Sequence, residues 1–452
     1  MAEIRPFRAL RYDLEKAGEL SGEISKEISL LTCPPYDIIS AEERKSYLAQ
    51  NPRNIIRLEL PEAASPKENP YEQAGETLRE WLAQGVMKAD MDEGIYIYEE
   101  EFFDQVTHGE TKKLRGMICR VRLEEFSAGV VLPHEETLSK AKEDRFRLMR
   151  ATGCNFSQVY SLYRDERHVT RQRLRNLANS CAPRYDFSDG LVTHRLWVVN
   201  DPVAIEALRE DFTDRKLYIA DGHHRYETAL RYRNTLREEN TYCPGADYVM
   251  MMLVDMEDDG LVVFPTHRLI GGLKNFDGSA LLNGCKEWFT AEQKENRAET
   301  EQALKDSYDK GLHAFGFFDG NGWHTLVLRD ISVMDDMLPE LSAASRQLDV
   351  TILHTLILEK LLGIDKENMA AQKNLSYTRS SEEAEQSVSA GESQCCFLLN
   401  PTRVKEIGDV AAAGEKMPQK STYFYPKLIT GLVVNPLFDP ERILTLGEEQ
   451  KL

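Results

Sequence analysis

A mixed α/β fold of the α+β type is the class that this sequence predicts, on three observations. The chain has 452 residues, and single cores usually stop growing at about 250 to 300 residues, so more than one domain is expected. Segments with strand-like alternation and segments with helical periodicity follow one another in no regular order. Hydrophobic residues make up 42% of the chain and charged residues 29%, which is the composition of a globular protein that buries real cores.

The first predicted region, residues 1–92, is an α/β region. It closes with the amphipathic segment NPYEQAGETLREWLAQGVM, for which we expect a helix. Earlier, CPPYDIIS places Pro34 and Pro35 in a fixed turn that presents Tyr36 and Asp37. Two interpretations stay open for this turn, a rigid loop that packs Tyr36 or a contribution to a site.

The second predicted region, residues 93–272, is the core that we expect to bind a ligand. IYIYEEEF and LRGMICRVRLEEF alternate apolar and polar residues and predict two adjacent antiparallel strands. The segment GVVLPHEETLSKAKEDRFRLMRATG predicts a helix that carries Leu138, Phe146 and Met149 and stops at Gly153. RLWVVN, LYIADG and ADYVMMMLVDM are short apolar runs that predict further strands.

The third predicted region, residues 273–452, is a C-terminal α/β region. HAFGFFDGNGWHTLVL predicts a hairpin with Gly-Asn-Gly at its turn, and LDVTILHTLILEKLLGI predicts a leucine-rich helix that ends at Gly363. Polar stretches near residues 65–70, 235–245 and 380–393 are candidates for linkers or for surface loops.

The net charge of −19 argues against a protein whose main ligand is a nucleic-acid backbone, because such binding depends on lysine and arginine against phosphates. No signal-peptide pattern opens the chain and no run of about 18 apolar residues occurs, so we expect a cytoplasmic protein with no membrane partner. The eight cysteines are scattered, without paired CxxC motifs at zinc spacing, and we expect them to be reduced and to bind no metal.

The segment LYIADGHHRYETAL carries the strongest functional signal. A strand that ends at Asp221 and Gly222 and leads into a helix creates a helix N-terminus, which attracts anions. Gly222 allows close approach of a phosphate, Arg225 supplies a forked donor, and His223 and His224 can bind oxygens or transfer protons. Asp221 is explained if it holds a magnesium ion or takes the proton of an attacking hydroxyl.

A structural interpretation competes at each of these positions. Asp221 could be a helix cap, the two histidines could be satisfied core or surface residues, and Arg225 could pair with Glu227 or another acid. Five special residues in sequence at a strand-to-helix turn favour the phosphate-binding interpretation.

Two further segments could complete a site. VVLPHEETLSKAKEDR places His134, Glu135 and Glu136 between a strand end and a helix, although these carboxylates could instead stabilise the first helical turn. The zinc-protease motif HExxH would need a histidine at position 138, where this chain has Leu138. The segment therefore does not predict a zinc protease.

The other segment, MPQKSTYFYPKL, contains two lysines and two hydroxyls that could line a phosphate or carboxylate pocket. An exposed cationic strand edge is the alternative. The possible substrate-binding residues are Glu136, Lys420, Ser421, Thr422 and Lys427.

IADGHHRYETALRY resembles the phosphate-binding motif of the ParB/sulfiredoxin-like fold, and its Asp-Gly-His-His-Arg form is similar to the free-serine kinases of that superfamily. From RPFRALRYD to MPQKSTYFYPKL, the chain also resembles the bacterial and archaeal family known as domain of unknown function 1015 (DUF1015). The resemblance implies a ParB-like nucleotide-binding core over residues 93–272, with Mg²⁺ and ATP or ADP as cofactors. It also implies a catalytic glutamate, which matches Glu135 by order and context, with Glu136 as a close second.

The first functional hypothesis is therefore a kinase of a small hydroxylated molecule, with free L-serine as the acceptor that the resemblance implies. Its predicted catalytic residues are Glu135, Asp221 and His224, and its predicted phosphate-binding residues are Gly222, His223, His224 and Arg225. The alternative is a non-enzymatic switch that binds CTP or ATP. A DNA-reading partition protein is disfavoured by the acidic remainder of the chain, and sulfiredoxin chemistry by His223, which stands where that chemistry needs a cysteine.

Overall fold

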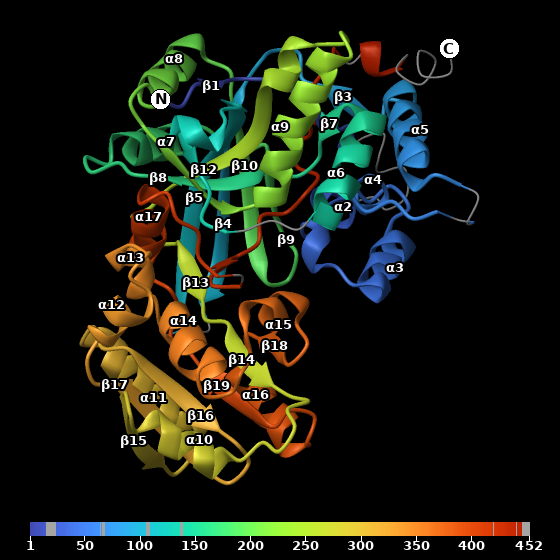
Figure 1. Ribbon diagram of the computed structural model, residues 1–452. Coiled ribbons are helices and arrows are strands. Elements are labelled where there is room, and N and C mark those ends of the chain that lie inside the picture. Colours follow the sequence, from blue (N-terminus) through green and yellow to red (C-terminus); the bar gives the residue numbers. More distant parts are fainter. Residues whose placement is uncertain are drawn as a thin grey trace. The chain divides into compact units, whose positions relative to one another are not determined.

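The computed structural model describes residues 1–14, 24–63, 65, 68–104, 109–135, 139–418, 420–439 and 441–444. It is a mixed α/β structure, as predicted, and divides into two compact units (Figure 1). Unit 1 comprises residues 1–133, 137–262 and 426–452, and unit 2 comprises residues 134–136 and 263–425. The three predicted regions do not coincide with these units, because the first region and most of the second fold together and the C-terminal segment returns to them.

Unit 1 is built on a nine-stranded sheet with the order β6-β11-β8-β12-β5-β4-β10-β9, in which β1 also pairs with β5. Most neighbours are antiparallel, but β11 runs parallel to β6 and β12 runs parallel to β8. The strands are β1 (Ile4–Arg5), β4 (Ile95–Asp104), β5 (Glu110–Arg122), β6 (Val131–Leu132), β8 (Val159–Tyr163), β9 (Tyr185–Ser188), β10 (Val192–Val199), β11 (Leu217–Asp221) and β12 (Tyr248–Asp255).

The predicted antiparallel pair is confirmed as β4 and β5, with Tyr96 opposite Ile118. Within unit 1, two small sheets pair segments that are far apart in the sequence. The first joins β2 (Leu10–Tyr12) to β3 (Met87–Ala89), and the second joins β7 (Cys154–Asn155) to β21 (Asn435–Pro436).

The helices of unit 1 cover this sheet, with α9 packed beside α6 and against β8 and β12 (Figure 1). Gly153, with φ +64°, ends α6 as predicted, and its N–H donates to the Met149 carbonyl. The helices are α2 (Ile24–Leu31), α3 (Ala41–Gln50), α4 (Ile56–Glu59), α5 (Pro70–Ala83), α6 (Ser139–Thr152), α7 (Val169–Ser180), α8 (Pro202–Glu210) and α9 (His223–Glu238), with the 3₁₀ turns η1 (Tyr36–Ile38), η2 (Phe126–Ala128) and η3 (Pro244–Asp247).

Unit 2 contains a six-stranded sheet with the order β15-β17-β16-β19-β14-β18. The predicted hairpin is confirmed as β16 and β17, with positive φ at Gly320 and Gly322 in its turn. The strands are β14 (His267–Ile270), β15 (Phe289–Lys294), β16 (Ala314–Phe318), β17 (Trp323–Leu328), β18 (Leu375–Thr378) and β19 (Cys395–Leu398), and a separate two-stranded sheet consists of β13 (Val262–Phe264) and β20 (Tyr423–Tyr425).

The predicted leucine-rich helix is present, but its geometry changes along its length. It begins as α14 (Asp349–Ile352) and continues as the π-helix η4 (Leu353–Glu359), whose leucines pack in the core of unit 2. The other helices of this unit are α10 (Gly278–Cys285), α11 (Arg297–Asp309), α12 (Val333–Met337), α13 (Ala343–Arg346), α15 (Lys366–Ala371), α16 (Ser381–Ser389) and α17 (Val404–Ala412).

Among the helices of the described residues, none combines the length and the apolarity that crossing a membrane requires.

Candidate functional site

The strand-to-helix turn that the sequence predicts is present in unit 1. Strand β11 ends at Asp221, Gly222 adopts φ +92°, and α9 begins at His223. The register of β11 against β8 shifts between Ile219 and Asp221, as in a β-bulge, and the pairing resumes with Asp221 opposite Tyr160. The first turn of α9 directs backbone N–H groups away from the helix at this point, as an anion site requires.

Asp221 is held by two cations, one from α9 and one from the C-terminal segment. Arg225 donates from Nη2 to Oδ2 at 2.6 Å, and Lys427 donates from Nζ to Oδ1 at 2.6 Å. Burial alone would raise the pKa of Asp221, but Lys427, Arg225 and His223 together lower it well below its usual range. Asp221 is therefore a carboxylate at neutral pH, and it is not the helix cap, because Gly222 occupies the N-cap position.

Arg225 is fixed on both sides. Its Nη1 donates to the Gln158 carbonyl at 2.5 Å, and a Cβ atom at position 222 would lie only 2.9 Å from its Nε. Glycine at position 222 therefore serves two needs, a positive φ and space for the guanidinium. Glu227, the alternative partner considered from the sequence, pairs with Lys142 instead.

Tyr36 and Asp37 belong to the surroundings of Arg225. Burial would lower the pKa of Arg225, but Asp221, Asp37, Tyr36 and Glu59 raise it. The guanidinium carbon of Arg145 lies 3.9 Å from the centre of the Tyr36 ring, which is a cation–π distance. The CPPYD turn therefore packs Tyr36 and also places Asp37 where it acts on Arg225.

Glu59 and Arg145 are residues of this region that the sequence did not reveal. Both are buried, Arg145 Nη1 lies 3.6 Å from Glu59 Oε1, and the Ser157 hydroxyl donates to the same carboxylate oxygen at 2.7 Å. They come from α4 and α6, and nothing in the local sequence of either helix indicates that they meet.

The two histidines open α9. His223 is buried and close enough to Asp221 to lower its pKa, while His224 is only half-buried. His224 is therefore the more accessible of the two to a ligand.

The predicted residues upstream and downstream of the turn meet one another in unit 2. Glu135 forms an isolated parallel bridge with Met417, and its Oε1 accepts from the Lys420 N–H at 3.3 Å. His134 Nε2 lies 3.0 Å from the Thr422 hydroxyl. The His-Glu segment and the Lys-Ser-Thr segment are thus one cluster, and Glu136 lies outside the described residues.

The two lysines of MPQKSTYFYPKL take separate positions. Lys427 belongs to unit 1, where it holds Asp221, and Lys420 is exposed in unit 2 with φ +58°. The Ser421 hydroxyl donates to the Pro418 carbonyl at 2.5 Å. The segment is thus divided between the two units, with Lys420, Ser421 and Thr422 in unit 2 and Lys427 in unit 1.

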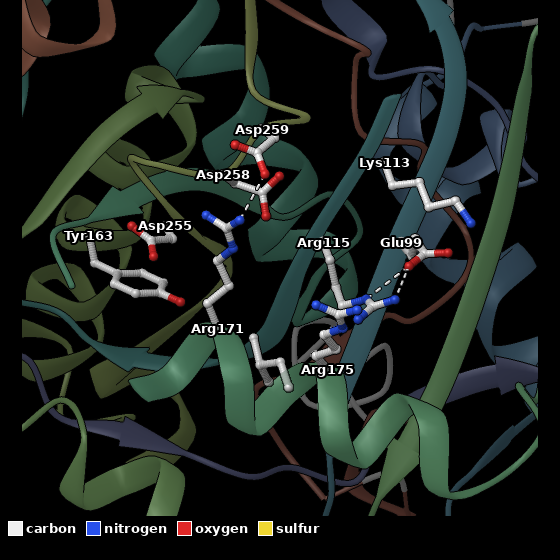
Figure 2. A pocket seen from close by; sticks show the side chains of 10 residues that line it. Glu99, Lys113, Arg115, Tyr163, Arg171, Arg175, Asp255, Asp258 and Asp259 are labelled. Carbon is white, nitrogen blue, oxygen red and sulfur yellow. Dashed lines mark hydrogen bonds and ion pairs between the residues drawn. The ribbon is translucent and has the colours of Figure 1, made fainter. Parts of the chain in front are cut away.

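A different cavity of unit 1, of about 140 Å³, is lined by charged side chains that pair with one another (Figure 2). Arg171 donates to Asp259 at 2.8 Å, and Arg115 Nε donates to Glu99 at 2.8 Å. Burial raises the pKa of Asp258 in its wall to about 6. Most of the charged side chains that line this cavity therefore already have an oppositely charged partner within the protein.

Within the described part of the chain, no three His, Cys, Asp or Glu side chains gather as a metal site. Asp221 fits poorly as a magnesium ligand in this arrangement, because both of its oxygens already accept hydrogen bonds from cations.

Comparison with solved structures gives several weak likenesses. A conserved hypothetical protein from Pyrococcus furiosus is 14% identical with a TM-score of 0.34, covering 72% of this chain and 97% of its own. A free serine kinase in complex with AMP is 13% identical with a TM-score of 0.35, covering 72% and 93%. SbnI with a C-terminal truncation, from Staphylococcus aureus, is 12% identical with a TM-score of 0.35, covering 74% and 97%.

None of the curated proteins compared with this chain matches it. The family model described as "Protein of unknown function (DUF1015)" matches residues 4–351. This match spans well over half of the 452 residues, and the chain belongs to the DUF1015 family.

Proposed function

We propose that the turn Asp221–Arg225 binds the phosphates of ATP or ADP and that the protein is a kinase of a small hydroxylated molecule. One observation carries the proposal. A sheet strand passes through a glycine at φ +92° into the N-terminus of α9, where Arg225 and Lys427 flank the turn. This arrangement of glycine, helix N-terminus and fixed cations is the one that phosphate groups favour.

Each turn residue has a distinct role in this proposal. Gly222 lets a phosphate oxygen approach the backbone N–H groups, and Arg225 and His223 stabilise its charge. His224, the more exposed imidazole, contacts the phosphoryl group that is transferred.

Asp221 acts by positioning rather than by holding metal. Its carboxylate fixes Arg225 through one oxygen and Lys427 through the other. Magnesium would bind together with the nucleotide phosphates, and in this proposal no protein side chain holds it.

Glu135 is the proposed general base, which draws the proton from the acceptor hydroxyl. The resemblance to free-serine kinases supports this role.

The acceptor is proposed to be a small hydroxyl-bearing acid, with L-serine as the first candidate from the resemblance. Lys420, Ser421 and Thr422 lie in the same cluster as Glu135 and are the proposed acceptor contacts, together with Glu136.

The test incubates the protein with magnesium and ATP or ADP, with and without L-serine and related hydroxy acids. Phosphorus NMR follows the phosphorylated product. Glu135→Gln and His224→Ala are expected to lower turnover by about 100-fold or more, the usual contribution of a general base or a charge-stabilising group. Glu42→Gln, an exposed glutamate of α3, is the matched control and should leave turnover unchanged.

The result also separates the kinase from the nucleotide-binding switch. Acceptor-dependent product that disappears in both variants establishes the kinase. Tight nucleotide binding without acceptor-dependent turnover would contradict it and favour a switch that binds CTP or ATP.

A further inference from the structure

A cavity lined wholly by residues of unit 2 is larger than the charged cavity of unit 1. Its volume is about 360 Å³, within the range of sites for small organic molecules. One wall is a single face of the α14–η4 helix, because Thr351, His354, Thr355 and Glu359 follow at intervals of three, one and four residues.

The helix that forms this wall is a π-helix from Leu353 to Glu359. The Lys360 N–H donates to the Thr355 carbonyl, five residues back, at 3.3 Å. Such widened turns are rare and occur frequently at functional sites. Here the π-helical turns carry an imidazole, a hydroxyl and a carboxylate to the cavity wall, in a segment that is otherwise leucine-rich.

Arg268 lies directly behind two residues of the wall. It is 1% exposed, its guanidinium carbon is 5.2 Å from the centre of the Tyr377 ring, and its Nε donates weakly to His354 Nε2 at 3.4 Å. Another of its nitrogens donates to the Thr266 carbonyl, but Nη2 has no hydrogen-bond partner among the described residues. Both His354 and Tyr377 line the cavity.

No carboxylate of the described chain forms an ion pair with Arg268, which sets this guanidinium apart from a structural ion pair. Burial lowers the pKa of Arg268 to about 10, so the group is still a cation at neutral pH. A buried charge of this kind is costly unless an anion accompanies it.

The hydrogen bond from Arg268 determines which ring nitrogen of His354 carries the hydrogen. Because Nε2 faces the Arg268 donor, it must accept, and the imidazole hydrogen is then on Nδ1. Burial and the nearby Arg268 lower the pKa of His354 well below its usual value, so the ring is neutral and offers one N–H donor.

The remaining lining completes an amphipathic site. Lys366 and Lys416 are exposed at the cavity, Glu359 is the acid among the lining residues, and Leu338, Leu341 and Met369 supply apolar surface. Behind the lining, Arg268 adds a cation next to His354, and Glu415 accepts from the Ser345 hydroxyl.

We propose that this cavity binds a small organic carboxylate with an apolar body. The carboxylate accepts from His354 and the wall hydroxyls in the field of Arg268, and its body packs on the leucines and the methionine. The proposal does not depend on the kinase proposal, because no nucleotide takes part and no residue of the Asp221–Arg225 turn lines the cavity. The cavity adjoins the proposed acceptor cluster, since Met417 of its lining forms a bridge with Glu135.

The experiment titrates the full chain, without nucleotide, by isothermal calorimetry. The probes are the straight-chain carboxylates from acetate to octanoate, the matching primary amides and inorganic phosphate. We expect each carboxylate to bind at least about tenfold more tightly than the amide of equal length. We also expect the affinity to rise with chain length until the cavity is filled.

Arg268→Met and His354→Phe should each weaken carboxylate binding by about tenfold or more, while Arg329→Met, an exposed arginine of the same unit, should not. If Arg268→Met does not fold by circular dichroism, His354→Phe decides the outcome. The proposal is overturned if no carboxylate binds at millimolar concentration, if amides bind equally well, or if phosphate alone binds.

Discussion

Arg225 of unit 1, with 10% of its side chain exposed, and Arg268 of unit 2, which is buried, face opposite situations. Arg225 has a carboxylate at 2.6 Å and further acids near it, and these acids raise its pKa. Arg268 has a ring, an imidazole and a carbonyl around it, and burial lowers its pKa to about 10. The surroundings of Arg225 neutralise its charge, and those of Arg268 do not.

Arg225 is thus a cation that the protein itself positions and compensates, whereas Arg268 is a cation that requires a ligand. Arg225 is held in place before any phosphate arrives, so binding there needs little rearrangement. The charge of Arg268 is compensated only when an anion enters the neighbouring cavity, so the free protein is destabilised at that position.

The largest expected effect comes from breaking the first arrangement. Asp221→Asn removes the charge that compensates both Arg225 and Lys427, and we expect it to lower the free energy of unfolding by about 3 kcal/mol, since breaking a buried ion pair leaves uncompensated charge. Urea denaturation measures the loss. Asp259→Asn, which breaks an exposed pair with Arg171, should cost less than about 1 kcal/mol and is the control.

The same carboxylate gives a pH dependence with a definite sign. The pKa of Asp221 is lowered in the folded protein, so its contribution to stability is complete above its unfolded pKa of about 4 and is lost as pH falls through the folded value. The stability difference between the wild type and Asp221→Asn should therefore shrink below about pH 4. A difference that stays constant from pH 7 to pH 3 would contradict the assignment.

A smaller effect is expected at Gly222. Alanine there must adopt φ +92° and place its Cβ 2.9 Å from Arg225 Nε, so we expect a loss of about 2 kcal/mol, partly from backbone strain. Gly129→Ala is the matched control, because Gly129 has φ +67° and nothing within 4 Å of the added atom, so only the strain of about 1 kcal/mol applies. Equal losses in the two variants would show that the contact with Arg225 has no effect.

The smallest effect should have the opposite sign. Arg268→Met removes an uncompensated buried charge, so we expect the ligand-free protein to gain about 1 kcal/mol in stability. Thermal unfolding in a buffer without carboxylates measures the gain. A loss of similar size to that of Asp221→Asn would mean that Arg268 serves the structure rather than a ligand.

Local features of the fold were predictable from the sequence. The antiparallel pairing of β4 with β5, the Gly-Asn-Gly hairpin and the strand-to-helix turn at Gly222 depend on neighbouring residues, and each is confirmed. The α-to-π change within residues 349–359 was not predictable, because the leucine pattern is shared by both kinds of helix.

Long-range organisation was not accessible in the same way. Lys427 is 206 positions from Asp221, and Asn435 pairs with Asn155 across the length of the chain. The polar stretches considered as linkers do not mark the unit boundaries, which fall after Val262 and after Tyr425. These boundaries depend on which segments pair, and composition does not encode that pairing.

Calorimetric titration with Mg-ADP measures whether the turn at Gly222 binds nucleotide phosphate. The wild type and Gly129→Ala should bind ADP alike, whereas Gly222→Ala should bind it at least about tenfold more weakly, because the added Cβ obstructs the backbone and displaces Arg225. Absence of ADP binding to the folded wild type, or equal binding by Gly222→Ala, would contradict phosphate binding at this turn.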